Sequence, residues 1–227
     1  MIISLHVPKT GGETFKLALE TAFGPRMLSD YGDMVGFISD DILRHREKRA
    51  AAMREKRDEI EQRHDIIHGH FIADKYRGLF RTEQYVAFFR DPMQQAISLY
   101  KYLQRQPLRK NPTIRDVQGA DVTFLDFLER ETVTNSQTEL VGSAPLESFA
   151  MVALAEEYER GVALFNATFG CRVEITESVN VDPDRVGPRH PLTAAEREAV
   201  QNHRRADIEL YQRAKQKFNR LCIARGL

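Results

Sequence analysis

Short apolar runs alternate with amphipathic stretches along this chain. Four of the runs have the length and composition of β-strands, at residues 1–7, 65–71, 83–89 and 171–177. The run at 83–89 is aromatic and apolar throughout, as expected for a strand that is buried on both faces. The pattern therefore predicts strands at these four places.

Apolar residues at helical spacing mark the stretches between these runs. The spacing predicts helices at residues 14–23, 92–104, 124–128 and 146–165, and a long C-terminal helix. Pro92 suits the first position of a helix, and Thr193 with Glu196 forms a capping box at the start of the last one. The polar, Gly- and Pro-containing stretches predict loops at 24–36, 107–122, 135–143 and 182–191.

Strands that alternate with helices favour an α/β fold, in which a central, mostly parallel sheet carries helices on both faces and gives three layers. The 227 residues suffice for one such domain and are few for two, so we predict a single domain, 1–227. Ligands of such sheets bind beyond the carboxyl ends of the strands, where the strand order reverses. The loops after the first three predicted strands carry Lys9, the pair His68 and His70, and Arg90.

A charged helical insertion is predicted near residues 40–64. It begins with Asp40 and Asp41, which are good capping residues, and continues with Arg, Lys, Glu and Ala, which are good helix formers. One hypothesis is that its basic side chains bind a sulfated glycan. The mixture of both charge signs favours the alternative, a solvated helix with ion pairs four residues apart.

Composition excludes several classes of protein. Lys plus Arg and Asp plus Glu number 33 each, so there is no overall positive field for nucleic acid or membranes. Cys171 and Cys222 match no metal-site spacing and form no disulfide framework, so we expect buried free thiols. The chain has no run of about 18 apolar residues and no signal-peptide pattern at its start. We therefore expect a cytoplasmic protein without a membrane span.

The turn after the first predicted strand has the features of an anion site. Lys9, Thr10, Gly11, Gly12, Glu13 and Thr14 lead into a helix, whose N-terminal N–H groups and dipole favour a negative ligand. Glycine allows the backbone to come close to a phosphate, and lysine and threonine add a charge and hydroxyl groups. The alternative is a plain strand-to-helix turn. A Walker A loop is excluded because its lysine follows the last glycine, whereas Lys9 precedes both glycines.

The segment His-Val-Pro-Lys-Thr-Gly-Gly at residues 6–12 resembles the phosphosulfate-binding loop of carbohydrate sulfotransferases that use 3′-phosphoadenosine 5′-phosphosulfate (PAPS). It is most similar to the heparan uronyl 2-O- and glucosaminyl 6-O-sulfotransferases and their bacterial relatives. The resemblance implies a P-loop-like fold, PAPS as the donor, no required metal, and a hydroxyl acceptor, by default on a sugar or glycan. It also implies that residues 9–14 hold the 5′-phosphosulfate, with Lys9 stabilising the leaving group.

Later stretches extend this resemblance. Arg90-Asp91-Pro92, followed by Ser98 and then Tyr100, resembles the family's 3′-phosphate motif, in which an arginine fork and a serine hydroxyl bind the phosphate. Without the resemblance, Arg90 could equally pair with Asp91 or Asp74. The segment at 135–138 resembles an Asn-x-Gln-Thr segment of the family, and the resemblance continues to about residue 218. Arg185 and Arg189, in the late loop, are weaker candidates for contact with the donor.

The transfer of a sulfuryl group to a hydroxyl needs a base that accepts the hydroxyl proton. Histidine suits this role because its unperturbed pKa is about 6.5. In the family a histidine after the second strand has this role, and His70 is the better match, because His68 precedes the glycine and is expected to point toward the strand. The predicted catalytic residues are therefore His70 and Lys9.

Glu13 departs from the resemblance, since the family has Thr or Ser at this position. A carboxylate beside a phosphosulfate is repulsive unless it points away, although the N–H of residue 13 can still bind the donor. Two alternative functions stay open. A P-loop kinase would need Mg²⁺ and a Walker lysine. A non-enzymatic module with a sulfotransferase fold would bind a nucleotide or glycan without turnover.

Overall fold

A computed structural model describes residues 1–33, 35, 38–107, 115–118, 121–130, 135–176 and 189–227. In these residues a five-stranded parallel sheet lies at the centre, in the order β2-β3-β1-β4-β5. The strands are β1 (Ile2–Leu5), β2 (Met27–Asp30), β3 (Ile66–Gly69), β4 (Gln84–Phe89) and β5 (Met151–Leu154). The predicted α/β class with a parallel sheet is therefore confirmed.

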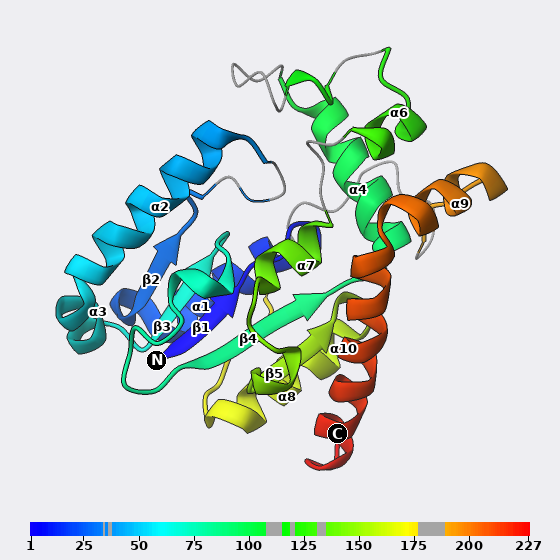
Figure 1. The fold of residues 1–227 in the computed structure, drawn as a ribbon. Coiled ribbons are helices and arrows are strands. Elements are labelled where there is room, and N and C mark those ends of the chain that lie inside the picture. Colours follow the sequence, from blue (N-terminus) through cyan, green and yellow to red (C-terminus); the bar gives the residue numbers. More distant parts are fainter. Residues whose placement is uncertain (34, 36–37, 108–114, 119–120, 131–134, 177–188) are drawn as a thin grey trace.

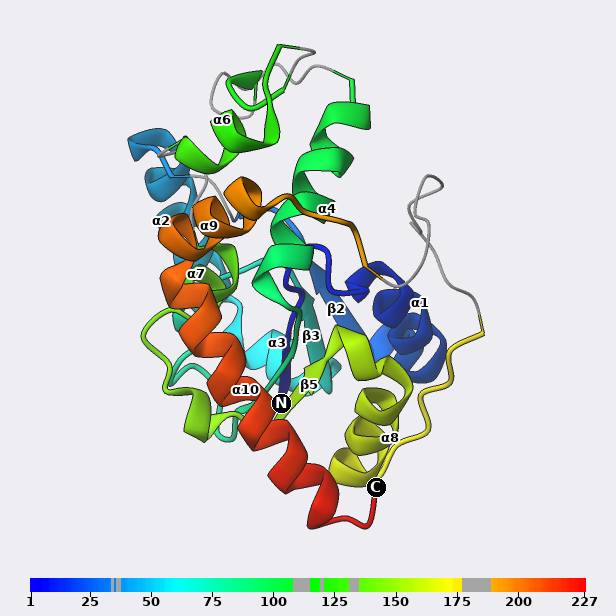
Figure 2. The same ribbon diagram turned by 90° about the vertical axis from the view of Figure 1, so that its right-hand side faces the viewer.

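Helices cover both faces of this sheet (Figures 1 and 2). Helices α1 (Gly12–Phe23) and α8 (Tyr158–Phe169) lie on one face, and α7 (Ser136–Val141) and α10 (Arg205–Ile223) lie on the other. The three-layer arrangement predicted from the sequence is thus present.

In the described parts of the chain, no helix is both long and apolar enough to cross a membrane.

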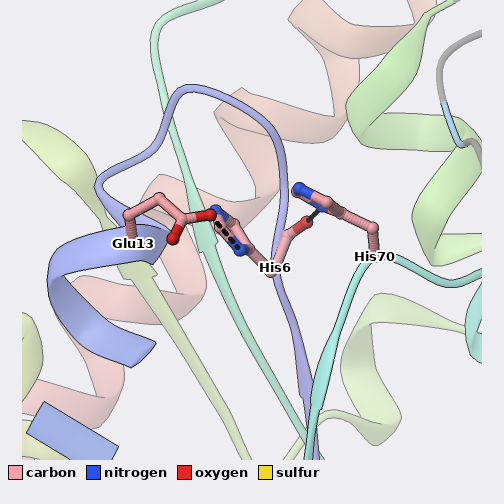
Figure 3. Close-up of side chains that lie close together, drawn as sticks. All are labelled: His6, Glu13 and His70. Carbon is pink, nitrogen blue, oxygen red and sulfur yellow. Dashed lines mark hydrogen bonds and ion pairs between the residues drawn. The ribbon is translucent and has the colours of Figure 1, made fainter. Parts of the chain in front are cut away.

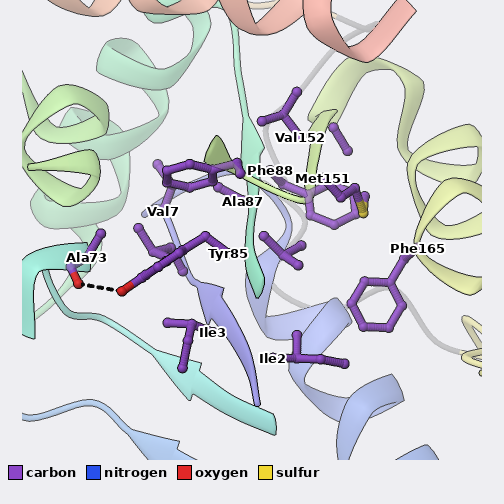
Figure 4. Packing of buried hydrophobic residues seen from close by; sticks show 14 of the residues in the cluster. Ile2, Ile3, Val7, Ala73, Tyr85, Ala87, Phe88, Met151, Val152 and Phe165 are labelled. Atoms are coloured by element: carbon purple, nitrogen blue, oxygen red, sulfur yellow. Dashed lines mark hydrogen bonds between the residues drawn. The ribbon is translucent and has the colours of Figure 1, made fainter. Parts of the chain in front are cut away.

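The main hydrophobic core lies between the sheet and these helices. The strand residues of β1, β3 and β5 are all buried, because both faces of the sheet are covered. Figure 4 shows buried side chains of this core, among them Ile3, Ala87 and Val152 from the strands and Phe165 from α8. Tyr85 also lies in this core and donates a hydrogen bond to the carbonyl of Ala73 at 3.2 Å. Its hydroxyl is therefore satisfied although it is buried.

A second, smaller hydrophobic cluster lies beyond the carboxyl ends of the strands (Figure 1). It joins α4 (Pro92–Arg105), α6 (Phe124–Glu129) and α9 (Ala194–His203). Pro92 occupies the first position of α4 as predicted, and Thr193 forms the predicted capping box with Glu196. Asp91, which the sequence analysis did not name as a cap, accepts N–H bonds at the start of α4. The strand ends therefore meet a layer of helices, not open solvent alone.

The charged stretch forms α2 (Asp40–Glu55) and α3 (Arg57–Arg63), as predicted. The expectation of a solvated helix holds for most of its length but is wrong for two arginines. Arg46 forms a nearly buried ion pair with Glu139 at 2.7 Å, and Arg49 pairs with Asp30 and Asp33. The helix is therefore attached to the body of the protein by ion pairs.

Four predicted elements are corrected by the structure. The loop predicted at 24–36 contains β2, and the loop predicted at 135–143 contains α7. The helix predicted at 146–165 instead contains β5, with α8 starting only at Tyr158, because an apolar run of four residues has no periodicity that separates a buried strand from a helix. The strand predicted at 171–177 has no regular structure over residues 171–176.

Short helical turns complete the described elements. They are η1 (Gly24–Arg26), η2 (Ala73–Lys75), η3 (Leu146–Ser148) and η4 (Ala155–Glu157).

Both cysteines are free, with Cys222 buried and Cys171 half-buried. The expectation of buried free thiols is thus confirmed for Cys222, whereas Cys171 is free but not buried.

Candidate active site

The turn between β1 and α1 is tightly held. Lys9 has a positive φ of 67°, which is uncommon for a residue with a side chain, and Gly11 has a φ of 87°. The hydroxyl of Thr10 is buried and donates to the carbonyl of Val7 at 2.9 Å. The first hydrogen bond of the following helix runs from the Phe15 N–H to the Gly11 carbonyl, and no side chain caps that helix. The turn thus presents a helix N-terminus of the kind that binds anions.

The two glycines of this turn are required by packing inside the protein. A Cβ atom at Gly12 would lie 1.9 Å from Cδ2 of the His6 ring. A Cβ atom at Gly11 would lie 2.8 Å from the ring of Tyr158, whose hydroxyl donates to the Gly11 carbonyl at 3.0 Å. The sequence prediction gave these glycines only the role of admitting a phosphate. The structure adds a second role, the close packing of His6 and Tyr158 against the turn.

Arg90 lies at the end of β4 and contacts the turn directly. Its Nη1 donates a hydrogen bond to the carbonyl of Lys9 at 2.9 Å. The ammonium of Lys9 lies 4.3 Å from the centre of the Tyr102 ring. The two cationic residues that the sequence assigns to opposite ends of one ligand are thus neighbours. Lys9 follows β1 and Arg90 follows β4, which are adjacent parallel strands. From β1 the chain continues to β2 on one side of the sheet, and from β4 it continues to β5 on the other side. Ligands of open α/β sheets bind where the strand order reverses in this way.

Buried glutamines fix the backbone around Arg90. The Arg90 N–H donates to Oε1 of Gln137, and Nε2 of Gln137 donates to the Arg90 carbonyl, both at 2.9 Å. Nε2 of Gln95 donates to the Pro8 carbonyl at 3.1 Å and to the Ser136 hydroxyl at 2.9 Å. Gln137 and Gln95 therefore connect β4, α4 and α7 to the turn after β1.

Asp91 and Asp74, the two alternative partners predicted for Arg90, have partners of their own. The Asp91 carboxylate accepts N–H bonds at the start of α4, and the Asp74 carboxylate accepts from Ser143. Ser98 lies in the middle of α4 and is nearly buried. Arg189 is exposed, and Arg185 lies outside the described residues.

Three histidines gather where β1 and β3 end. His68 lies opposite Ser4 in the sheet, and its Nδ1 is 2.9 Å from the Ser4 hydroxyl, so its ring is turned toward strand β1. His70 lies just after β3, and its Nδ1 donates to the carbonyl of His6 at 2.6 Å. This bond leaves Nε2 of His70 as the nitrogen that carries a lone pair. The rings of His6 and His70 are 4.1 Å apart between centroids.

Burial keeps these histidines neutral at pH 7. It lowers the pKa of His68 to about 3, and the charge of a protonated His70 would lower it further. Burial also lowers the pKa of His70 to about 4, although its bond to the His6 carbonyl acts in the opposite direction. The pKa of His6 is lowered well below its ordinary value, chiefly by burial and then by its two histidine neighbours. An unprotonated His70 can accept a proton, as a general base must.

Tyr31 and Glu13 complete this cluster. The Tyr31 hydroxyl is 2.8 Å from Nδ1 of His6, and burial raises the pKa of that hydroxyl. The Glu13 carboxylate lies 4.0 Å from the same nitrogen, and its side chain is 43% exposed. Figure 3 shows Glu13, on the first turn of α1, directed toward His6, with His70 bonded to the His6 backbone. The sequence gave no reason to expect Tyr31 here, and His6 was noted only as part of a motif.

This chain is similar to known proteins in its structure. No family model matches the chain, and no curated protein matches it. Among solved structures, the mouse sulfotransferase SULT7A1 complexed with PAP is similar, at 15% sequence identity and a TM-score of 0.46. The match covers 76% of this chain and 60% of the mouse chain. This chain therefore spans less than two thirds of that protein's length.

Proposed function

We propose that this protein is a sulfotransferase that moves a sulfuryl group from PAPS to an acceptor hydroxyl. One observation carries the proposal: the Arg90 guanidinium donates to the Lys9 carbonyl at 2.9 Å. Two segments suited to binding phosphate groups thus lie together at the carboxyl ends of adjacent strands. A donor with phosphate groups at two positions of one nucleoside needs two such segments close together.

Each end of the donor has its own candidate residues. At the 5′-phosphosulfate, the candidates are Lys9, Thr10, Gly11, Gly12, Glu13 through its N–H, and Thr14. Thr10 already donates its hydroxyl proton to Val7, so we assign its N–H to the donor. At the 3′-phosphate, the candidates are Arg90, whose guanidinium has a fork geometry that matches phosphate, and Ser98.

His70 and Lys9 would act on the transfer itself. A bond forms between the acceptor oxygen and sulfur as the bond between sulfur and the 5′-phosphate oxygen breaks. The acceptor proton passes to Nε2 of His70, the nitrogen left available by the bond of Nδ1 to the His6 carbonyl. Negative charge grows on the leaving phosphate oxygen, and the Lys9 ammonium stabilises that charge more in the transition state than before it. This requires the ammonium to leave its position over the Tyr102 ring.

Calorimetric titration of the full chain with 3′-phosphoadenosine 5′-phosphate (PAP) tests the binding part of this proposal. Arg90→Ala should weaken binding by about tenfold to a hundredfold, since it removes a charge-assisted contact. Arg172→Ala, at an exposed arginine beyond the end of α8, is the matched control and should bind as the parent does. Thermal unfolding verifies that both variants are folded. Equal affinity of the parent and folded Arg90→Ala would contradict the assignment of the 3′-phosphate.

Turnover distinguishes the remaining alternatives. Release of PAP from PAPS in the presence of a panel of hydroxyl acceptors, with sugars and glycans first, is the expected result. Binding of PAP without turnover on any acceptor would favour a non-enzymatic binding module. Phosphate transfer from ATP that depends on Mg²⁺ would favour a kinase. His70→Ala should lower the turnover number by about a hundredfold or more while PAP affinity stays close to that of the parent.

A further inference from the structure

The cluster of His6, Glu13 and His70 has the composition of a metal site. Each of the three residues offers one ligand atom, and these atoms all lie within 4.8 Å of one another. Two imidazoles and one carboxylate are a ligand set that binds Zn²⁺ and leaves further coordination positions open. We propose that this cluster binds a divalent transition metal ion, represented by Zn²⁺, and that the bound ion inhibits the enzyme.

Small movements would bring the ligand atoms to coordination distance. Zinc ligands lie about 2.0–2.2 Å from the ion, so two ligands of a tetrahedral site are roughly 3.4 Å apart. Nδ1 of His6 and the nearer oxygen of Glu13 are 4.0 Å apart. The Glu13 side chain is 43% exposed, which gives it room to turn inward. The movement between His6 and Glu13 can therefore come from Glu13, whose side chain is far more exposed than that of His6.

Hydrogen bonding and packing determine which nitrogens face the ion. Nδ1 of His70 donates to the His6 carbonyl at 2.6 Å, which orients the ring and leaves Nε2 as the ligand. A bond from the other ring nitrogen to a backbone carbonyl is the usual support of a metal-binding histidine. Nε2 of His6 packs against Gly12, where a Cβ atom would lie 2.1 Å from it. Nδ1 of His6, which faces Glu13, is therefore the second nitrogen ligand.

Tyr31 competes for the same nitrogen. Its hydroxyl is 2.8 Å from Nδ1 of His6, so a metal ion must displace that hydrogen bond. Lys16 also opposes a cation, since its ammonium lies 5.1 Å from the centre of the Tyr31 ring, although it pairs with Glu20 at 3.7 Å. The Glu13 carboxylate is the group in the cluster that offsets this positive charge. Removal of Tyr31's hydroxyl should tighten metal binding, and removal of Glu13's charge should weaken it.

Inhibition follows from the proposed function, and this part of the inference rests on it. The lone pair on Nε2 of His70 would bind the ion, so it could not accept the proton of the acceptor hydroxyl. The resemblance to sulfotransferases implies a reaction that needs no metal, and the metal ion proposed here takes no part in that reaction. It instead explains a use for Glu13, the residue that departs from the sulfotransferase pattern.

Zinc binding is measured on the full chain without any nucleotide, by calorimetric titration with ZnCl₂ in competition with a chelator. The parent should bind one zinc ion that Glu13→Gln weakens by about tenfold or more. Glu20→Gln, which removes a carboxylate from the same helix, is the matched control and should change the affinity less than threefold. Tyr31→Phe should raise it severalfold. Equal zinc affinity of the parent and Glu13→Gln, or no zinc bound by the parent, would overturn the proposal.

A spectroscopic measurement and an activity assay complete the test. Co²⁺ in place of Zn²⁺ should give the visible absorption of a tetrahedral nitrogen and oxygen site in the parent, and this absorption should be lost in Glu13→Gln. Its absence from the parent would count against the site. Zinc should also stop turnover in the parent at concentrations tenfold lower than in Glu13→Gln. Zinc binding that depends on Glu13 in a protein that binds no PAP would refute only the proposed function. Turnover of PAPS without zinc binding would refute only this site.

Discussion

Gln137 holds both backbone polar groups of Arg90 with its single side-chain amide. It accepts from the Arg90 N–H and donates to the Arg90 carbonyl, at 2.9 Å in each case, and the glutamine is fully buried. The N–H of Gln137 in turn lies 3.4 Å from the Asp207 carboxylate, which also accepts from Thr138. The direction of the Arg90 side chain therefore depends on a segment 47 residues later in the chain.

Gln137→Ala should affect stability and PAP binding together. The substitution removes the two bonds that Gln137 makes to the part-buried N–H and carbonyl of Arg90. At about 1–2 kcal/mol for each bond, we expect a loss of about 2–4 kcal/mol. Urea denaturation measures the stability loss. Titration with PAP at low temperature and without urea measures the loss of affinity in the molecules that remain folded. Full stability of this variant would show that the paired bonds contribute little.

Gly12→Ala should destabilise the protein because the new methyl group would overlap the His6 ring. Overpacking of this kind costs about 1–3 kcal/mol. A double-mutant cycle with His6→Ala isolates the cause, since the methyl group has space once the ring is removed. We expect Gly12→Ala to cost less than half as much in the His6→Ala background. An equal cost in both backgrounds would mean that the main-chain conformation at Gly12, and not the contact with His6, is responsible.

Stability should fall as the pH is lowered from about 6.5 to about 4. The pKa values of His68 and His70 in the folded protein are about 3 and 4, whereas an unfolded histidine has a pKa near 6.5. In this window the unfolded chain binds protons that the folded chain does not, so the free energy of unfolding decreases by up to about 1.4 kcal/mol per pH unit for each histidine. Lys9, Lys16 and Glu13 also face this cluster.

Urea denaturation between pH 5 and pH 7.5 measures this slope. His68→Leu should reduce it, because one proton-binding site of the unfolded chain is lost. His203→Gln, at an exposed histidine of α9, is the control and should leave the slope unchanged. A slope for His68→Leu equal to that of the parent would contradict the contribution of His68.

Tyr102→Leu should tighten PAP binding severalfold. The Lys9 ammonium lies 4.3 Å from the centre of the Tyr102 ring, an interaction worth about 0.5–2 kcal/mol that binding of the donor would give up. The leucine variant removes this competition while keeping an apolar side chain at the position. Titration with PAP at low salt provides the measurement. Weaker binding by Tyr102→Leu would instead indicate that the ring contacts the ligand.

The sequence predicted the strands that coincide with continuous apolar runs. The strands at β1, β3 and β4 follow such runs, and the loops after them carry Lys9, His70 and Arg90. Two strands were missed for physical reasons. Strand β2 is an edge strand with only two apolar residues. In β5, Val152 and Ala153 follow Phe149 at helical spacing, so this apolar stretch fitted one helix continuous with α8.

The contacts that hold the candidate site together could not be predicted from the sequence. Gln137 contacts Arg90 across 47 residues, and Tyr158 contacts Gly11 across 147 residues. Nothing local in the sequence marks these side chains, because their partners are decided by how the helices pack on the sheet. The resemblance of 135–138 to a family segment was the only available signal for Gln137, and it did not indicate the partner.

Asp30 and Asp33, which flank Tyr31 in the sequence, form a network of ion pairs with Lys75 and Arg49. Lys75 bonds to Asp30 at 2.6 Å and to Asp33 at 2.8 Å, all three with nearly buried side chains, and Arg49 brings α2 to the same carboxylates. Because these carboxylates are nearly buried, salt screens their pairs with α2 much less than it would screen exposed pairs. Loss of the Arg49 pairs would loosen the segment that carries the Tyr31 hydroxyl, so a substitution in α2 would be felt at the contact between Tyr31 and His6.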